Sequence, residues 1–386
     1  MTETTSGGTA PITICLVDAP PKGSEPGAIL EALRRASAMT EEVWFDRLGH
    51  KDFTELPEAN LNGLLHQQYA RKREVIALEG EVTGLVDGPE GLPCIVPTTD
   101  LADARVVASC YVMNSREDNP HLLSEVEIAV AAGRRHQGIG TRMLAALEQL
   151  ARAWGATTIS GWANYLGIAE GEKVMPTDGP FGVPVEDEVT RFMQKHGFAL
   201  AQTERHSIQP MDGDLGVFGE PAAPEGYTLE VWCGRMDPAV AEDVAHLSTV
   251  FEATMPHGEL DFQPETYTAE RVLAGNEVTH KDSDTVNVAA RHLATGEMVA
   301  RTTLAKYLHK DEAAWQGVTV VLPAHRGHGL GRAIKLAAMH EARRRWPKLE
   351  RVHTWNAGEN DHMWAINESL GYRTAGVCGA WQKKLA

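Results

Sequence analysis

The stretch Arg135-His136-Gln137-Gly138-Ile139-Gly140 recurs far downstream as Arg326-Gly327-His328-Gly329-Leu330-Gly331. Both copies have the pattern R-x-x-G-x-G, both follow a run of residues typical of a β-strand, and both open a helical pattern. One copy of so short a pattern is weak evidence, but two copies in the same strand, loop and helix context indicate an internal repeat. The sequence therefore predicts two copies of one α/β fold.

The length of the chain agrees with this division. Its 386 residues suit two domains of typical size, and 43% hydrophobic residues leave enough apolar material for two cores. A stretch rich in Gly, Pro and acidic residues without a period separates the halves. We expect a disordered N-terminus at 1–10, a first domain at 11–211, a linker at 212–226 and a second domain at 227–386.

Bulk properties exclude several classes of function. No stretch is long enough to span a membrane, and the first residues lack the order of a signal peptide. Five scattered cysteines without a C-x-x-C pair favour a reducing cytoplasm, and no H-E-x-x-H spacing predicts a metal. The net charge of -17 opposes nucleic-acid binding. It would suit a cationic substrate, although solubility is the simpler explanation.

Hydrophobic periodicity predicts similar series of elements in the two halves. In the first half we expect strands at 11–17, 74–78, 105–112, 126–130 and 157–162, with helices at 28–38 and 141–154. In the second half we expect strands at 227–232, 285–290, 298–307, 316–322 and 351–355, with helices at 239–251 and 331–346.

The glycine loops favour a pyrophosphate ligand. Glycines at these spacings let the backbone approach a phosphate, and the N–H groups at the start of the following helix favour an anion. The G-x-G-x-x-G pattern of dinucleotide-binding folds and the G-K-[ST] of a P-loop are both missing. A glycine-rich strand-to-helix turn without a ligand is the plain alternative.

These loops resemble the pyrophosphate loop of the GNAT superfamily of acyl-CoA-dependent N-acyltransferases. The resemblance extends to the segment Asn356–Tyr372, which is similar to the family's last motif, N-x-x-A, a helix and G-(F/Y). The whole resembles the tandem GNAT proteins of actinobacteria, an architecture shared with mycothiol synthase. It implies two GNAT domains, each a mixed, mostly antiparallel central sheet flanked by helices.

The resemblance also implies an activity and a donor. The chain would be an N-acetyltransferase that moves an acetyl group from acetyl-CoA to a small-molecule amine by direct attack, as a monomer or homodimer. Arg142 would add to the phosphate site or lie on a solvated face. The implied CoA-binding residues are Ile128, Val130, Arg135, His136, Gln137, Gly138, Ile139, Gly140, Thr141, Thr319, Val321, Arg326, Gly327, His328, Gly329, Leu330, Gly331, Arg332 and Asn360.

Direct transfer needs a base for the amine, donors for the oxyanion and an acid for the departing thiolate. In the family, backbone N–H groups hold the oxyanion and a Tyr protonates the thiolate. The matching positions here hold Met193 and Asn367, of which only Asn367 can donate a hydrogen bond to sulfur. Water or the ammonium proton of the acceptor would replace the missing acid.

The two halves differ in their candidates for the base. The strand before the first loop carries Glu125 and Glu127, whereas the equivalent strand of the second half carries Gln316 and Val318. A solvated strand face is the alternative for both carboxylates. The second half has the fuller last motif, which favours it as the catalytic half, while the carboxylates argue for the first.

Two further segments bear on the acceptor. The first half inserts 165–188, which would be a lid, a cover over a degenerate site or an interface between the halves. In the second half, Glu259 and Asp261 would hold a cationic amine or lie on a solvated loop. Two other functions stay open: a non-catalytic acyl-CoA sensor or scaffold, and a transferase that uses another activated acyl donor.

Overall fold

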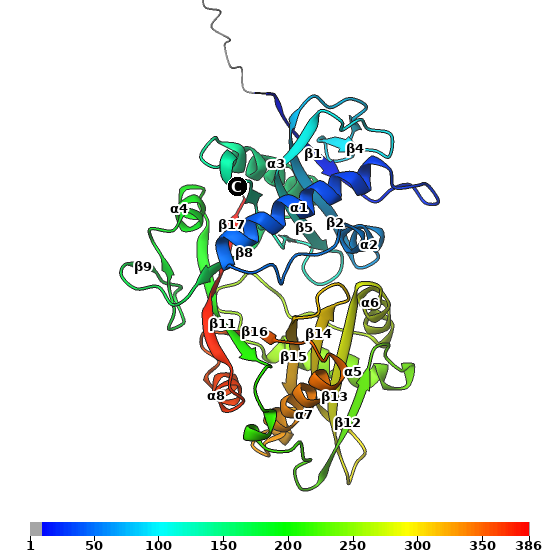
Figure 1. The fold of residues 1–386 in the computed structure, drawn as a ribbon, viewed down its shortest axis with the longest axis vertical. Coiled ribbons are helices and arrows are strands. Elements are labelled where there is room, and N and C mark those ends of the chain that lie inside the picture. The colour runs from blue at the N-terminus through cyan, green and yellow to red at the C-terminus, as the bar shows by residue number, and fades with distance from the viewer. Residues whose placement is uncertain (1–9, 386) are drawn as a thin grey trace, which may run out of the picture. The chain divides into compact units, whose positions relative to one another are not determined.

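A computed structural model describes residues 10–385, so the expected disordered N-terminus lies outside the described residues except for Ala10. The chain forms two compact units (Figure 1). The first contains the residues up to Gly161 and those from Lys384 onward, and the second contains Trp162–Lys383. Within 10–385 no helix is long and apolar enough to cross a membrane.

The first unit is built on a six-stranded sheet in the order β3-β4-β1-β2-β5-β7. Helix α1 packs against β5, and a core cluster joins α1 and α2 to the sheet. The elements are β1 (Ile12–Val17), α1 (Ala28–Leu48), α2 (Pro57–Leu65), β2 (Ala70–Gly80), β3 (Val86–Asp87), β4 (Pro93–Ile95), β5 (Ala104–Ser115), β6 (Leu122–Leu123), β7 (Ala129–Val130), α3 (Ile139–Trp154) and the start of β8 (Thr158–Leu166).

The second unit is built on a longer sheet in the order β12-β13-β14-β15-β16-β11-β17-β8. Its elements after β8 are β9 (Lys173–Val174), β10 (Val183–Pro184), α4 (Glu188–Lys195), β11 (Ala199–Pro210), β12 (Tyr227–Cys233), α5 (Ala241–Thr254), α6 (Ala269–Asp282), β13 (Ser283–His292), β14 (Met298–Tyr307), β15 (Ala313–Val321), α7 (Leu330–Arg345), β16 (Arg351–Ala357), α8 (Asp361–Ser369) and β17 (Arg373–Lys384).

Strand β11 lies between β16 and β17, although it precedes the predicted linker. It is antiparallel to both neighbours, with Glu204 opposite Ala357 of β16 and Cys378 of β17. A strand from the first repeat thus completes the sheet that carries the second repeat. This pairing is why the compact units divide at Gly161, whereas the repeat predicts a boundary at 212–226.

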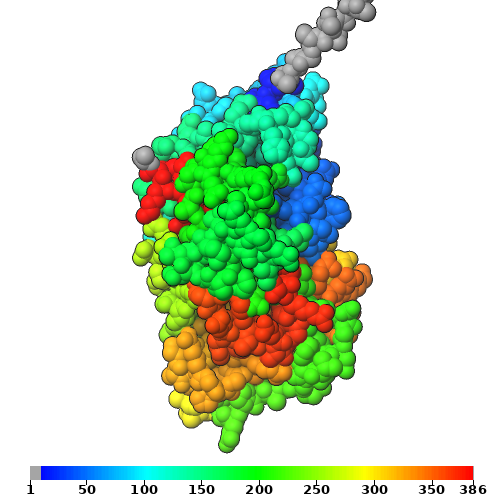
Figure 2. All heavy atoms as spheres, turned by 90° about the vertical axis from the view of Figure 1, so that its left-hand side faces the viewer, coloured from blue at the N-terminus to red at the C-terminus, as the bar shows by residue number. Residues whose placement is uncertain are grey.

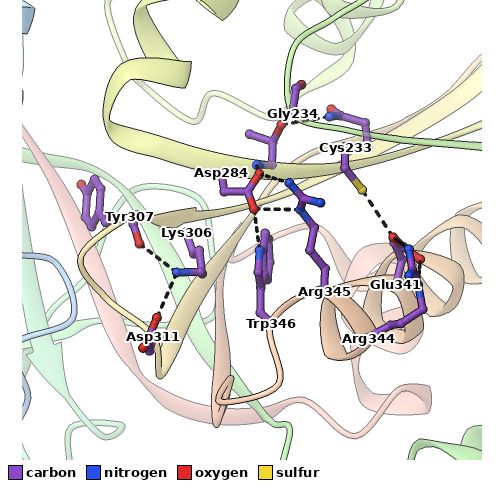
Figure 3. A network of polar contacts seen from close by, with 12 residues as sticks. Cys233, Gly234, Asp284, Lys306, Tyr307, Asp311, Glu341, Arg344, Arg345 and Trp346 are labelled. Atoms are coloured by element: carbon purple, nitrogen blue, oxygen red, sulfur yellow. Dashed lines mark hydrogen bonds and ion pairs between the residues drawn. The ribbon is translucent and has the colours of Figure 1, made fainter.

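The end of α7 far from the glycine loop is fixed to the sheet by a polar network (Figure 3). Asp284 of β13 accepts hydrogen bonds from Arg345 Nε at 2.7 Å and from Trp346 Nε1 at 2.9 Å. Glu341, one turn earlier, bonds Arg344 and Cys233. Because α7 is held at its C-terminal end, the position of the loop at its N-terminal end is also defined.

The insertion 165–188 packs against the last helix of the second repeat. Phe181 stacks on Trp364 of α8 with ring centres 5.0 Å apart, and its carbonyl accepts a hydrogen bond from Thr203 Oγ1. In Figure 2 the green surface of this segment adjoins the red surface of the last elements of the chain. The insertion therefore contacts α8 of the C-terminal motif through Phe181.

Local differences from the predicted elements have physical causes. The strand expected at 126–130 is a strand only at Ala129–Val130, because Glu125 has a positive φ of 62° and Val126 N bonds Ser160 O instead. Helix α1 runs ten residues beyond its predicted end at residue 38, to Leu48, before Gly49 in the left-handed conformation ends it. The helices α2 and α6 and the strand β17 were not predicted.

Candidate active sites

Each glycine loop leads from a strand through a short 3-10 turn into a helix. Gly138 and Gly329 have φ values of 79° and 75° and lie at the N-caps of α3 and α7. No side chain caps either helix start, so backbone N–H groups face outward there. An added Cβ would meet no atom within 4 Å at either glycine, and this open space suits an approaching phosphate.

The arginine that begins each motif belongs to the loop's own scaffold. Arg135 Nε donates to Val130 O, and Arg326 Nε donates to Val321 O, both at 3.2 Å. These bonds tie each loop to the last residue of its strand. The agreement between the two loops is direct structural evidence for the repeat.

Other predicted CoA-binding residues also have structural partners. Arg142 Nη2 donates to Ile12 O and Arg332 Nη2 to Phe218 O, both at 2.7 Å. Ile139 and Leu330 are buried at the first turn of their helices, so only their backbone can reach a phosphate. His136 has a φ of 60° where Gly327 of the other loop has 82°.

The strand before each loop diverges from its parallel neighbour. In the first repeat, β6 pairs with β8 at Leu122–Thr158, and the chain then crosses to pair with β5 at Ala129 and Val130. In the second repeat, β15 pairs with β16 only as far as Trp315–His353. Each divergence leaves an opening between parallel strands directly before the loop, where an extended group could bind backbone groups.

A group of acids lines the first repeat beside its opening. Glu74 of β2 is buried and accepts a hydrogen bond from Ser109 of β5, and Glu127 is half-buried. Burial raises the pKa of Glu74 to about 7 and that of Glu127 to about 8. Desolvation also raises the pKa of Glu125, but this side chain is exposed and therefore screened by water.

Tyr111 of β5 lies in the field of these acids. Burial raises the pKa of its hydroxyl first of all, and Glu55, Glu125 and Glu74 add to the effect. The hydroxyl is therefore a proton donor and not an ion at neutral pH. We define Glu74, Tyr111, Glu125 and Glu127 as the acidic cluster of the first repeat.

The strand before the loop of the second repeat carries no carboxylate. Gln316 Nε2 donates to Thr302 Oγ1 at 2.7 Å and to Thr303 O at 2.8 Å. The hydroxyl groups of Thr302 and Thr319 lie 2.7 Å apart. These polar groups bond one another, and none of them is a base.

The C-terminal motif has mainly structural contacts. Asn360 caps α8 by accepting a hydrogen bond from Met363 N at 3.2 Å. Asn367 is 4% exposed, and its Nδ2 donates to Asn356 Oδ1 at 2.6 Å. One of its two amide hydrogens is therefore already engaged. Met193, at the matching position of the first repeat, is also buried.

Sequence reasoning missed one carboxylate of the second unit. Glu204 of β11 is half-buried beside the end of β16, and burial raises its pKa to about 7, with a further contribution from Glu359. Its position follows from the exchanged strand, so no pattern near either loop pointed to it. The backbone N of the predicted acceptor residue Asp261 donates to Gln382 Oε1 of β17.

A cavity of about 560 Å³ lies beside the first glycine loop, lined by residues that include Ala131, Gly133, Arg105 and Arg134. Glu79 joins the two arginines, with Arg134 Nη2 at 2.7 Å from Glu79 Oε1. Glu42 also lines the cavity, so its two arginines are balanced by two carboxylates.

Comparison with known proteins agrees with this geometry. The family model of GNAT acetyltransferases matches residues 57–165 and again residues 249–372. The chain belongs to this family. No curated protein sequence matches this GNAT protein significantly. Two GNAT domains with mixed sheets flanked by helices confirm the predicted fold class.

Solved structures show the same tandem GNAT architecture. A tandem GNAT protein from the clavulanic acid biosynthesis pathway is 20% identical, with a TM-score of 0.70 over 97% of this chain and 98% of that one. A GCN5-related N-acetyltransferase from Sphaerobacter thermophilus is 16% identical, with a TM-score of 0.58 over 96% of this chain and 95% of that one. At these identities the likeness shows the fold alone.

Proposed function

We propose that this protein is an acetyl-CoA-dependent N-acetyltransferase acting on a small-molecule amine. The observation that carries the proposal is the doubled arrangement of a diverging strand, an uncapped helix start and a glycine loop with open space above it. Pantetheine would bind along each opening and the pyrophosphate on each loop. The acyltransfer chemistry follows from membership of the GNAT family.

Transfer takes place in the first repeat in this proposal, although the fuller C-terminal motif alone favours the second. Glu127 combines a half-buried position, a pKa near the working pH and a place two residues before β7, which leads into the loop. The strand of the second repeat carries no base, and Asn367 is engaged with Asn356. The acidic cluster suits an amine that arrives as a cation.

The chemical step can be written with the residues of the acidic cluster. The ammonium first releases one proton to water; the neutral amine then attacks the thioester carbonyl, backbone N–H groups of the diverging strand hold the oxyanion, and the C–S bond breaks. Glu127 takes the proton that the nitrogen loses and passes it to the thiolate, so no separate acid is needed. The products are an amide and CoA with a free thiol.

The test compares the two loops. Gly138→Asp and Gly329→Asp each place a carboxylate in the space above one loop, and Gly138→Asn and Gly329→Asn are controls that tolerate the same left-handed conformation without the charge. The assay is amine-dependent release of free thiol from acetyl-CoA, run with a panel of mono- and diamines.

We expect Gly138→Asp to abolish thiol release while Gly329→Asp retains most of it, and we expect each Asn variant to lose less activity than its Asp partner. Loss of activity only in Gly329→Asp would move the reaction to the second repeat. If no amine releases thiol above background although CoA binds, the protein is a sensor or scaffold. If the protein binds no CoA, another acyl donor is used.

We also propose that the protein works in a reducing compartment. All cysteines in the described residues are free thiols, which fits a reducing compartment such as the cytoplasm.

A further inference from the structure

Arg301 is a buried cation without a counter-ion. It lies on the central strand β14, opposite Ala289 of β13 and Val320 of β15, and is 9% exposed. Its Nη2 donates to the neutral hydroxyl of Ser248 on α5 at 3.0 Å, while its Nε has no hydrogen-bond partner. Among the described residues, no carboxylate lies within ion-pair distance of this guanidinium.

Other arginines of the same unit form ion pairs with carboxylates. Arg291 bonds Glu230 and Asp243, Arg271 bonds Glu265 at 2.6 Å, and all these arginines are more exposed than Arg301. A buried guanidinium is normally paired because its desolvation is costly. Burial lowers the pKa of Arg301 to about 10, so it still carries its charge at neutral pH.

The position of Arg301 can be compared with the equivalent position in the first repeat. Val130 and Val321 each lie five residues before the arginine of their loop. Ser109 is opposite Ala129 in the first repeat, and Arg301 is opposite Val320 in the second, so Ser109 and Arg301 are equivalent. Ser109 bonds the carboxyl group of Glu74. One point of the fold therefore faces an acid in the first repeat and presents a cation in the second.

The surroundings of Arg301 leave its charge available. Tyr267, which follows the α5–α6 connection, is the titratable group whose field it feels. The Tyr267 hydroxyl donates to Glu265 at 3.2 Å, and Glu265 is already bound by Arg271. Glu265 is thus neutralised by another arginine.

We propose that Arg301 anchors a binding site for a small molecule that carries a carboxylate, on the face of the second repeat covered by α5. A carboxylate would supply the acceptor for Nε and the counter-charge that the chain itself does not provide. The second repeat would then be a ligand-binding counterpart of the first, with the opposite charge preference. The proposal is independent of acetyl transfer, because the binding needs no CoA.

The test uses the full-length protein and matched pairs of probes that differ only in charge: acetate with acetamide, benzoate with benzamide, and phenylacetate with phenylacetamide. Binding is measured by calorimetry and by the rise in Tm. The proteins are the wild type, Arg301→Met, Arg301→Lys and the control Arg291→Met. Methionine is unbranched and uncharged and replaces the arginine side chain as far as Nε, so it fills most of the buried space.

We expect at least one acid to bind wild type about tenfold or more tightly than its amide, and this preference to vanish in Arg301→Met, weaken in Arg301→Lys and persist in Arg291→Met. We also expect Arg301→Met to raise the Tm without ligand, because an unpaired buried charge is removed. A lower Tm of Arg301→Met, or an equal preference in wild type and Arg301→Met, would overturn the proposal. So would the absence of any preference for acid over amide, whatever the outcome for acetyl transfer.

Discussion

If Glu127 is the base, the rate of transfer follows the ionisation of this one side chain. Its pKa of about 8 means that roughly a tenth of the molecules carry the carboxylate at pH 7 and roughly nine tenths at pH 9. We therefore expect kcat to rise about tenfold between these values. Glu127→Gln should lose about 100-fold to 10,000-fold, the usual contribution of a positioned base, and its rate should no longer follow this curve.

The assay is thiol release at saturating acetyl-CoA and amine from pH 6 to pH 10. The ionisation of the acceptor is common to all variants, so the ratio of the wild-type rate to the Glu127→Gln rate isolates the side chain. Two neighbours move the midpoint in opposite directions. Arg47 lowers the pKa of Glu127 and Glu125 raises it, so Arg47→Gln should shift the midpoint upward and Glu125→Gln downward.

This reasoning is refuted if Glu127→Gln keeps more than about a tenth of the wild-type rate. A midpoint near 7 that disappears in Glu204→Gln would instead assign the base to the carboxylate on β11. Movement of the midpoint in the same direction in both Arg47→Gln and Glu125→Gln would show that the neighbours act through structure and not through charge.

Three further results are expected. Lys335 is 1% exposed, and burial lowers its pKa to about 7. Above that pH the unfolded state binds more protons than the folded state, so the stability of the protein should rise from pH 7 toward 10.5. Lys335→Leu should raise the Tm at pH 7 and flatten this rise, and an unchanged pH dependence of stability would contradict this prediction. Arg205 lies 3.0 Å from the ring centre of Trp364, so Arg205→Ala should speed hydrogen exchange in α8, and unchanged exchange would count against this contact as an anchor. A Cβ at Gly161 would collide with the Val126 carbonyl, so Gly161→Ala should lower kcat by at least about tenfold with little change in CoA affinity, and an unchanged kcat would place the chemistry elsewhere.

The glycine loops could be predicted because their signals are local. Gly138 and Gly329 must take a left-handed φ directly before a helix, and such a requirement is visible in a few neighbouring residues. The helices after them follow from the apolar stripe and the terminating Gly155 or Pro347. Candidate catalytic residues that lie next to these loops in the sequence, such as Glu127, could be predicted for the same reason.

Site residues whose position depends on strand register could not be predicted from the sequence. Glu74 lies far from the first loop in the sequence, and it joins the acidic cluster only because β2 pairs with β5. Arg301 gains its meaning from its position opposite Val320 and from having Ser109 as its counterpart. Glu204 depends on a pairing between distant strands that no local period specifies.

The position of β11 between β16 and β17 has a consequence for how such a duplicated chain can evolve. A gene cut within 212–226 would give one product that carries β11 without its partners and another in which β16 and β17 have lost the strand between them. Both products would have open sheet edges that invite aggregation, so we expect soluble protein only when the two are produced together. Neither copy can be deleted, even if one of them performs no chemistry. A silent copy retained for this reason is free to acquire a different ligand.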